Sequence, residues 1–313
     1  MISHFDSIIN QQGFVILDGA LATELEARGA NLNHALWSAK LLAENPSLIK
    51  QVHEHYLQVG ANVISTASYQ ASFLGFEKQG YTHQEAIHFL QYSVQLAMKA
   101  RDHYLLQLNK PLTIKPLIAA SIGPYGAALA DGSEYTGYKN VAVNELIYFH
   151  QERLNILANT EADILAFETI PCLDEAIAIK ELLKKHPLQQ AWVSFSCKDE
   201  IHLSSGELFE EAVKLLEDSE QVIGIGVNCT APEFIRSLIQ IAKPITSKTI
   251  LVYPNKGEVY NPIEKVWEKA NNSCGSFLEN AALWFKDGAK AIGGCCRTSP
   301  ADIEQLSQLT KKI

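Results

Sequence analysis

Residues 222–232 read VIGIGVNCTAP and contain the structural unit from which the chain is built. The stretch begins with an uninterrupted apolar run, Val222–Val227, which is typical of a parallel strand covered on both faces. The polar pair Asn228-Cys229 follows this run. Ala231-Pro232 then opens a helix, because proline is favoured at the first helical position. The stretch predicts a strand, a short polar loop and a helix in immediate succession.

The same apolar signature recurs along the whole chain. Further short runs rich in Val, Ile and Leu, without polar alternation, are predicted to be buried parallel strands. They are Phe14–Leu17, Asn62–Thr66, Leu117–Ser121, Ile164–Phe167, Trp192–Ser196, Ile250–Tyr253 and Ala289–Ile292. With the first run they give eight strands, which is the number in a closed (β/α)8 TIM barrel. No Pro/Gly/Ser-rich linker interrupts the pattern, so we predict one α/β barrel domain over residues 1–313.

Helix starts fall between the runs. Pro46 and Pro300 each follow an N-cap residue, and Thr82 with Glu85 forms a capping box. An open doubly wound sheet would share this alternation of strands and helices, but it usually carries a glycine-rich phosphate loop. The nearest match, Gly224-x-Gly226, lacks the third glycine. We interpret it as close packing within a strand, which favours the closed barrel.

The composition limits the classes of function. The chain is 47% hydrophobic and has a formal net charge of −9. This acidic balance argues against nucleic acid or an anionic membrane as the main partner, because both require a basic surface. No apolar stretch approaches the roughly 18 residues of a membrane helix, and the first residues do not resemble a signal peptide. We therefore expect a cytoplasmic location, with the cysteines as thiols rather than a disulfide framework.

Polar and thiol side chains follow the predicted strands, at the end where barrel enzymes hold their chemistry. These positions are Asp18-Gly19, Ser65-Thr66, Ser121, Gly123, Glu168-Thr169, Ser196, Asn228-Cys229, Tyr253–Asn255 and Cys295-Cys296. Cys229, Cys295 and Cys296 follow two strands that are near neighbours around a barrel mouth. Three thiolates leave one position of tetrahedral zinc open, which is a catalytic arrangement. Soft sulfur ligands also favour zinc over magnesium or calcium.

Spacing alone leaves a second interpretation of these cysteines open. A free cysteine is often a small buried hydrophobe, and no tight C-x-x-C pair marks a metal site. Gly293-Gly294 would permit the sharp turn that brings two adjacent sulfurs to one metal. The remaining cysteines, Cys172, Cys197 and Cys274, are single, so we expect core filler or surface thiols.

The histidines offer no comparable metal site. His53-Glu54-His55 is not the H-E-x-x-H motif, and its spacing places the two rings on different faces of a helix. No histidine lies at a predicted strand end, so we expect surface or helix-face positions for all of them.

Two carboxylates and two long connections complete the candidate site. Asp18 and Glu168 end two strands and could act as an acid/base pair or bind a cationic group, although capping of the next helix is an alternative for Asp18. The connections 123–140 and 254–275 are longer than packing requires. Long loops in compact domains are often functional, so each is a candidate lid or a solvated insertion.

Together these motifs resemble the homocysteine S-methyltransferases, a family that includes betaine–homocysteine methyltransferase and the homocysteine module of methionine synthase. The resemblance covers nearly the whole chain in order. It is carried by LDGALATELEARG (17–29), GPYGAALADGSEYTGYKN (123–140), AFETIP (166–171), WVSFS (192–196), GVNCTAP (226–232), YPNKGE (253–258) and GGCCRTSP (293–300). The combination of GVNC with GGCCRT is highly specific for the family.

The resemblance implies roles for individual residues. Cys229, Cys295 and Cys296 resemble the zinc ligands of the family. The surroundings of Asp18, Gly19 and Glu168 resemble those that hold the amino acid part of homocysteine. The residues expected to bind or orient substrate are Asp18, Gly19, Glu168, Thr169, Asn228 and Asn255, with Tyr253 as a further candidate.

The expected reaction is methyl transfer from S-methylmethionine or S-adenosylmethionine to homocysteine, giving methionine. Betaine is the weaker donor, because the betaine enzymes place a tyrosine directly after the strand-four glutamate and this chain has Thr169. Trp37 and Tyr69 could still offer aromatic faces to a sulfonium. A zinc hydrolase and a thiol-based zinc or redox sensor without catalysis are two further classes of function to be weighed against a methyltransferase. The sequence leaves the preferred donor and the oligomeric state open.

Overall fold

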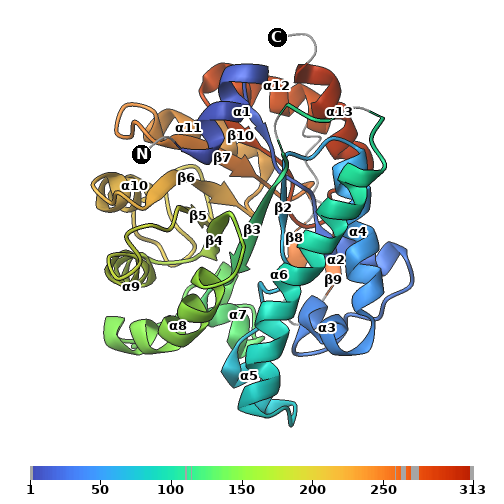
Figure 1. Cartoon of the computed structure of the whole chain (residues 1–313). Coiled ribbons are helices and arrows are strands. Elements are labelled where there is room, and N and C mark those ends of the chain that lie inside the picture. The colour runs from blue at the N-terminus through green and yellow to red at the C-terminus, as the bar shows by residue number, and fades with distance from the viewer. Residues whose placement is uncertain are drawn as a thin grey trace.

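The computed structural model describes residues 3–109, 111–113, 115–257, 259–261, 266–268 and 275–310, without the side chains of 259–261 and 266–268. Within these ranges, eight parallel strands form a barrel surrounded by helices (Figure 1). The strands are β1 (Val15–Ile16), β2 (Val63–Ser65), β3 (Leu117–Ile122), β4 (Ile164–Ile170), β5 (Ala191–Phe195), β6 (Val222–Asn228), β7 (Thr249–Tyr253) and β10 (Ala291–Ile292). Each lies within or overlaps one of the predicted apolar runs.

Hydrogen-bonded neighbours follow the order β1-β10-β7-β6-β5-β4-β3-β2. A parallel bridge between Leu17 and Val63 joins the two outer strands of this order, so the sheet curls into a nearly closed barrel. The predicted (β/α)8 fold is therefore confirmed. One addition was not predicted: β8 (Val259–Asn261) and β9 (Val266–Glu268) form an antiparallel hairpin in the connection after β7.

Helices cover the outside of the barrel and its ends. The α-helices are α1 (His4–Gln12), α2 (Leu21–Ala27), α3 (Leu41–Glu44), α4 (Pro46–Gln58), α5 (Phe73–Lys78), α6 (His83–Leu106), α7 (Tyr125–Leu129), α8 (Val143–Ala158), α9 (Leu173–Leu183), α10 (Phe209–Glu217), α11 (Ile235–Ala242), α12 (Phe277–Asp287) and α13 (Pro300–Thr310). Short 3-10 helices are η1 (Trp37–Lys40), η2 (Ser133–Tyr135) and η3 (Pro232–Phe234). No helix in the described part of the chain is long and apolar enough to cross a bilayer.

The predicted helix starts are confirmed by the caps. Asn45 accepts a hydrogen bond from the Leu48 N–H at the start of α4, with Pro46 at the first helical position. Thr82 and Glu85 form the capping box of α6. These side chains satisfy backbone donors that have no partner inside the helix.

The N-terminal helix closes the amino end of the barrel. Phe5 and Ile8 of α1 are fully buried and belong to the cluster of side chains inside the barrel. The Phe5 ring lies 6.0 Å from that of Trp192 in β5. In Figure 1, α1 lies at the opposite end of the barrel from α7, which follows the carboxyl end of β3.

The glycines of β6 allow it to lie close against β7. A Cβ atom on Gly226 would lie 1.7 Å from the carbonyl oxygen of Leu251, and one on Gly224 would lie 2.7 Å from the Leu251 side chain. Both distances are far below van der Waals contact. The interpretation of Gly224-x-Gly226 as close packing agrees with this geometry.

The connection 123–140 after β3, which we call the mouth segment, is fastened by one buried carboxylate. Glu175 of α9 accepts a hydrogen bond from the Tyr125 N–H at 2.7 Å near the start of the segment. It also accepts one from the Tyr138 hydroxyl near the end of the segment. His150 of α8 lies 2.7 Å from the same carboxylate, and Arg153 donates to the Gly123 carbonyl at 2.5 Å. Both ends of the segment are thus held to the helices behind it.

Two histidines are more buried than the sequence indicated. His53 on α4 and His150 on α8 are helix-face residues, as expected, but they have no exposed surface. Neither ring nitrogen of His53 has a hydrogen-bond partner among the described residues. Burial lowers the pKa of His53 to about 4. His53 and His55 lie on different faces of α4, as predicted, because His55 is only half-buried and contacts Glu24.

We expect His53 to make the protein less stable as the pH falls from about 6.5 to about 4. In this range the unfolded chain binds a proton at His53 and the folded chain does not. The free energy of unfolding therefore decreases as the pH is lowered. The lowered pKa corresponds to a loss of about 3 kcal/mol. Urea unfolding of the wild type and of His53→Leu at several pH values across this range measures the loss.

The comparison isolates His53, because carboxylates such as Asp18 and Glu168 titrate in both proteins. The difference in unfolding free energy between wild type and His53→Leu should change by about 3 kcal/mol over the range. A difference that stays constant with pH would show that His53 is protonated in the folded protein.

Candidate metal and substrate site

Three cysteine sulfurs meet at the carboxyl end of the barrel. Cys229 directly follows β6, and Cys295 and Cys296 come shortly after β10. Their Sγ atoms lie within 4.8 Å of one another. Cys296 Sγ is 3.9 Å from Cys229 Sγ and 4.0 Å from Cys295 Sγ. Two sulfurs on one tetrahedral zinc at about 2.3 Å lie roughly 3.8 Å apart, so both separations fit a shared ion.

The third pair of sulfurs is oxidised. Cys229 and Cys295 are joined by a disulfide bond, while Cys296 is a free thiol. The sequence argument expected thiols throughout, and for this pair that expectation is wrong in the structure, because the fold brings the two sulfurs together. Only a thiolate is a metal ligand. All three sulfurs can therefore bind an ion only after this pair is reduced.

Backbone geometry fixes the cysteines at the mouth. Cys229 has a φ of 46°, a left-handed conformation that non-glycine residues seldom adopt. Its N–H donates to the Tyr253 carbonyl at 3.2 Å, and the Cys295 N–H donates to the Pro254 carbonyl at 2.8 Å. The loop after β7 thus ties the loops after β6 and β10 together, which holds the sulfurs in place.

Gly293 and Gly294 serve packing rather than a turn. Neither has the positive φ of a glycine turn, although the sequence suggested one. A Cβ on Gly293 would lie 2.7 Å from the Asp18 carbonyl oxygen, and one on Gly294 would lie 2.3 Å from Thr298 Oγ1. The absent side chain of Gly293 lets the cysteine loop approach the loop after β1, and that of Gly294 lets the cysteine loop fold back on Thr298.

Asn228 is the polar centre of the site. It is fully buried, and its Oδ1 accepts hydrogen bonds at 2.7 Å from Ser194 Oγ and from the Thr169 N–H. Its Nδ2 donates to Thr169 Oγ1 at 2.7 Å and lies 4.0 Å from Cys295 Sγ. Thr169 itself has a left-handed φ of 62°. The amide therefore links the end of β4 to the sulfur cluster.

Two carboxylates, Asp18 after β1 and Glu168 in β4, are buried at the same mouth. Asp18 accepts hydrogen bonds from the Ser65 N–H at 2.7 Å and the Ser65 hydroxyl at 3.2 Å. Glu168 accepts one from the Ser121 hydroxyl. The Asp18 carboxylate is thus bonded to Ser65 and does not cap the next helix, which was the alternative role that the sequence left open.

These carboxylates lack a positive partner among the described residues, since neither appears in an ion pair. Burial, together with the nearby Glu168 charge, raises the pKa of Asp18 to about 8. Burial also raises the pKa of Glu168 to about 7. Two buried anionic groups this close favour a cation between or beside them.

The comparisons with known proteins identify the family. A sequence model described as homocysteine S-methyltransferase matches residues 15–310. This chain belongs to the homocysteine S-methyltransferase family. The homocysteine S-methyltransferase YbgG of Bacillus subtilis is 47% identical over 311 residues, which cover 98% of this chain and 97% of the relative. The predicted family and the prediction of an enzyme are confirmed.

Solved structures of the family agree with the fold. The metallated form of the homocysteine methyltransferase MmuM from Escherichia coli has a TM-score of 0.88 and 41% identity, covering 98% of this chain and 100% of that one. The oxidized form of the same protein gives the same values. The fold of this chain therefore agrees with that of MmuM over nearly the whole matched length.

Two further residues expected from the family motifs lie in the same loops. A Cβ on Gly19 would lie 2.9 Å from the Tyr56 hydroxyl, so no side chain fits there. The Asn255 N–H donates to the Thr230 carbonyl at 3.2 Å, and its Oδ1 accepts from the Gly257 N–H. The substrate-binding roles of these residues, as of the others, stay predictions.

Sequence reasoning missed part of this homocysteine S-methyltransferase site. It did not single out Ser194, which bonds Asn228, or Glu134 and Tyr135, which η2 brings to the mouth. Tyr135 interacts with Cys296. The only signal was the position of the SEY sequence within a long connection after a strand end.

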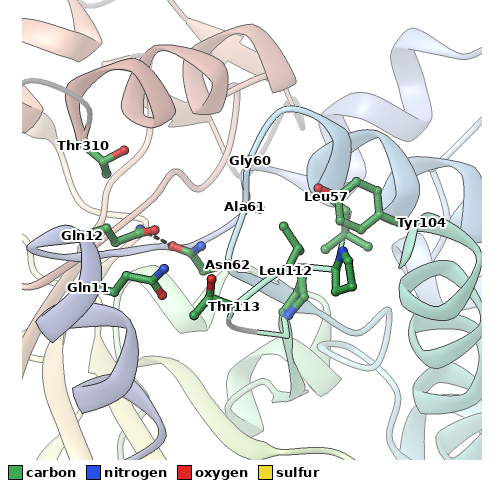
Figure 2. Close-up of a pocket in the computed structure, with 12 residues that line it drawn as sticks. Gln11, Gln12, Leu57, Gly60, Ala61, Asn62, Tyr104, Leu112, Thr113 and Thr310 are labelled. Atoms are coloured by element: carbon green, nitrogen blue, oxygen red, sulfur yellow. Dashed lines mark hydrogen bonds between the residues drawn. The ribbon is translucent and has the colours of Figure 1, made fainter. Parts of the chain in front are cut away.

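The other cysteines stand apart from this cluster. Cys172 and Cys197 are buried free thiols, in agreement with a role as core filler, and Cys274 lies outside the described residues. A hollow of about 480 Å³ lies near the amino end of β2 (Figure 2). There Gln12 Nε2 donates to Asn62 Oδ1 at 2.6 Å. Its lining has no acid, base or thiol ligand among the described residues, so it is not part of the metal site.

Proposed function

We propose that this chain transfers a methyl group from a sulfonium compound, S-methylmethionine or S-adenosylmethionine, to the thiol of L-homocysteine, giving methionine. One observation carries the proposal: Cys229, Cys295 and Cys296 converge beside the buried carboxylates of Asp18 and Glu168. The name of the YbgG relative supports homocysteine as the methyl acceptor.

We infer that zinc is the metal and that the three cysteines hold it once Cys229 and Cys295 are reduced. The metallated MmuM structure supports a metal in the family, and an all-sulfur ligand set favours zinc. Zinc would keep the homocysteine sulfur ionised at neutral pH, where a free thiol of pKa about 8.5 is only a few per cent thiolate. The need for reduced cysteines favours a reducing compartment such as the cytoplasm.

The residues of the chain position the substrates. We assign Asp18 and Glu168 to the α-ammonium of homocysteine, which would supply the positive charge that both carboxylates lack. Asn228 holds the end of β4 against the cysteine loop. The mouth segment, fastened by Glu175, covers this side of the barrel and limits the access of water.

The chemical step is a direct displacement. The homocysteine thiolate attacks the methyl carbon, a new S–C bond forms, and the bond between that carbon and the sulfonium sulfur breaks. The electron pair of the broken bond stays on the donor sulfur, which leaves as a neutral thioether. Since the leaving group needs no proton, the carboxylates are expected to position the substrate rather than to act as acid or base.

A sulfonium donor fits the residues better than betaine does. Thr169 follows Glu168 and is engaged with Asn228 through both its N–H and its hydroxyl. The betaine enzymes have a tyrosine at this position, and a quaternary ammonium is usually held by several aromatic faces. Betaine–homocysteine methyltransferase activity is therefore the second candidate.

A donor assay tests the proposal. Reduced protein loaded with zinc is given isotopically labelled homocysteine and S-methylmethionine, S-adenosylmethionine or betaine in separate reactions. Labelled methionine is measured by mass spectrometry, because the label distinguishes the methylated acceptor from methionine left by S-methylmethionine. Labelled methionine with a sulfonium donor is expected. Product with betaine alone, or with no donor, would contradict the proposal.

Removing the charge of Glu168 should weaken homocysteine binding. Glu168→Gln keeps the size of the side chain and an acceptor for the Ser121 hydroxyl, but it loses the ion pair to the ammonium. A charge-assisted hydrogen bond contributes about 1.5–3 kcal/mol, so we expect the KM for homocysteine to rise about 10- to 100-fold. Steady-state kinetics at saturating donor measure this. An unchanged KM would mean that Glu168 does not contact the amino acid.

A further inference from the structure

A third carboxylate, Glu134 of η2, is held at the mouth by the backbone around it. The Glu134 carbonyl accepts a hydrogen bond at 2.8 Å from the hydroxyl of Ser196, just after β5. A Cβ on Gly126 would lie 2.6 Å from the Glu134 nitrogen, so α7 packs directly on η2. Because the mouth segment is also fastened at both ends to Glu175, the position of Glu134 is set by the fold.

One carboxylate oxygen of Glu134 lacks a hydrogen-bond partner in the part of the chain that the structure describes. Its Oε2 atom is buried and makes no hydrogen bond among the described residues, and the ion pairs of that part of the chain do not include it. Burial, with a smaller contribution from Asp131, raises its pKa to about 7. An unpaired buried carboxylate is costly and is seldom kept without a ligand or a function.

The surroundings of Glu134 connect it to the sulfur cluster. Ser196, which donates to the Glu134 carbonyl, is followed by Cys197, whose N–H donates to Thr230 Oγ1 at 3.0 Å, next to Cys229. After burial, the Glu134 charge is the next influence that raises the pKa of Tyr69. Tyr69 in turn packs edge-on against Trp37, with ring centroids 6.1 Å apart. Glu134 is therefore held by its backbone at the strand ends next to Cys229, with Tyr69 close enough to feel its charge, and on a different strand end from Asp18.

We propose that Glu134 recognises the positive charge on the sulfur of the methyl donor. This inference rests on the proposed function, which makes the donor a sulfonium. The sulfonium must lie in line with a thiolate held at the cysteines, and Glu134 is an unpaired anion in that neighbourhood. The homocysteine ammonium is already matched by Asp18 and Glu168. Glu134 with the rings of Tyr69 and Tyr135 forms a site for a soft cation.

Glu134→Gln tests this role, because it removes the charge and keeps the shape. We expect the KM for S-methylmethionine to rise about tenfold or more, the size expected for losing a charge-assisted contact. The KM for homocysteine and the bound zinc per chain should stay within about twofold of wild type. Asp131→Asn is the matched control: it removes a charge from the same segment and keeps the acceptor for the Ser133 N–H. Because Asp131 affects the Glu134 charge only weakly, the donor KM of this control should stay within about twofold of wild type.

Inhibition by methionine separates charge recognition from a general effect on the site. Methionine is the neutral thioether counterpart of S-methylmethionine, so its inhibition constant against the donor should be the same in wild type and Glu134→Gln. Equal weakening of methionine and donor, or an unchanged donor KM, would overturn the inference. If the wild type makes no labelled methionine from either S-methylmethionine or S-adenosylmethionine, the proposed function fails instead. Equal melting temperatures for the two proteins confirm that the variant is folded.

Discussion

Replacing Cys295 by alanine is expected to abolish zinc binding and methyl transfer together. The variant keeps Cys229 and Cys296 but loses one of the three sulfurs that meet at the mouth. Without a metal, only a few per cent of the homocysteine is thiolate at neutral pH. Its sulfur is also no longer held in line with the donor, which lowers the rate of methyl transfer further. We expect turnover to fall by about 10³-fold or more.

The measurement is zinc per chain by mass spectrometry, beside labelled methionine formation, both in the presence of a reductant. The reductant is needed because Cys229 and Cys295 form a disulfide in the structure. Cys197→Ala is the matched control, since it removes a buried thiol outside the cluster and should keep its zinc. A Cys295→Ala protein with a full complement of zinc would contradict the assignment of ligands.

Replacing Gly226 by alanine is expected to prevent the barrel from folding normally. The added Cβ would lie 1.7 Å from the Leu251 carbonyl oxygen and 2.9 Å from the Leu251 nitrogen, and these are backbone atoms that cannot rotate away. Gly226 pairs with Leu251 in the ladder between β6 and β7. The two strands must separate, and we expect a loss above about 4 kcal/mol, which is comparable with the stability of many whole domains.

Gly275→Ala is the control for this substitution. Its Cβ would lie 3.2 Å from the Oε2 atom of Glu279, the far end of a flexible side chain. We expect the control to melt within a few degrees of wild type, whereas Gly226→Ala should yield little folded protein by circular dichroism. A Gly226→Ala protein with a wild-type melting temperature would show that β6 and β7 can move apart at little cost.

The barrel could be predicted because its strands are covered on both faces and therefore have uninterrupted apolar sequences. The predicted ends were less accurate. The run Ile164–Phe167 extends in the structure to Ile170, through the polar residues Glu168 and Thr169. The hairpin of β8 and β9 was not predicted, because strands of this length are too short to show a periodicity.

The candidate site was only partly predictable. Spacing alone left Cys229 and the Cys295-Cys296 pair open between a metal site and buried filler, and the family motifs favoured the metal. The contacts of Asn228 with Ser194 and Thr169, and the burial of Glu134, depend on residues far apart in the chain. No local pattern marks such partners, because the fold alone brings them together.

The single carboxylate that secures both ends of the mouth segment bears on the route by which amino acids travel to and from the sulfurs. If the mouth segment opened as a lid, Tyr125 and Tyr138 would both have to leave Glu175. The buried carboxylate of Glu175 would then keep fewer hydrogen-bond partners. Loss of partners for a buried charge costs several kcal/mol. We therefore expect the mouth segment to keep its position during each catalytic cycle. Substrates and products would then enter and leave past the other loops at the carboxyl end of the barrel.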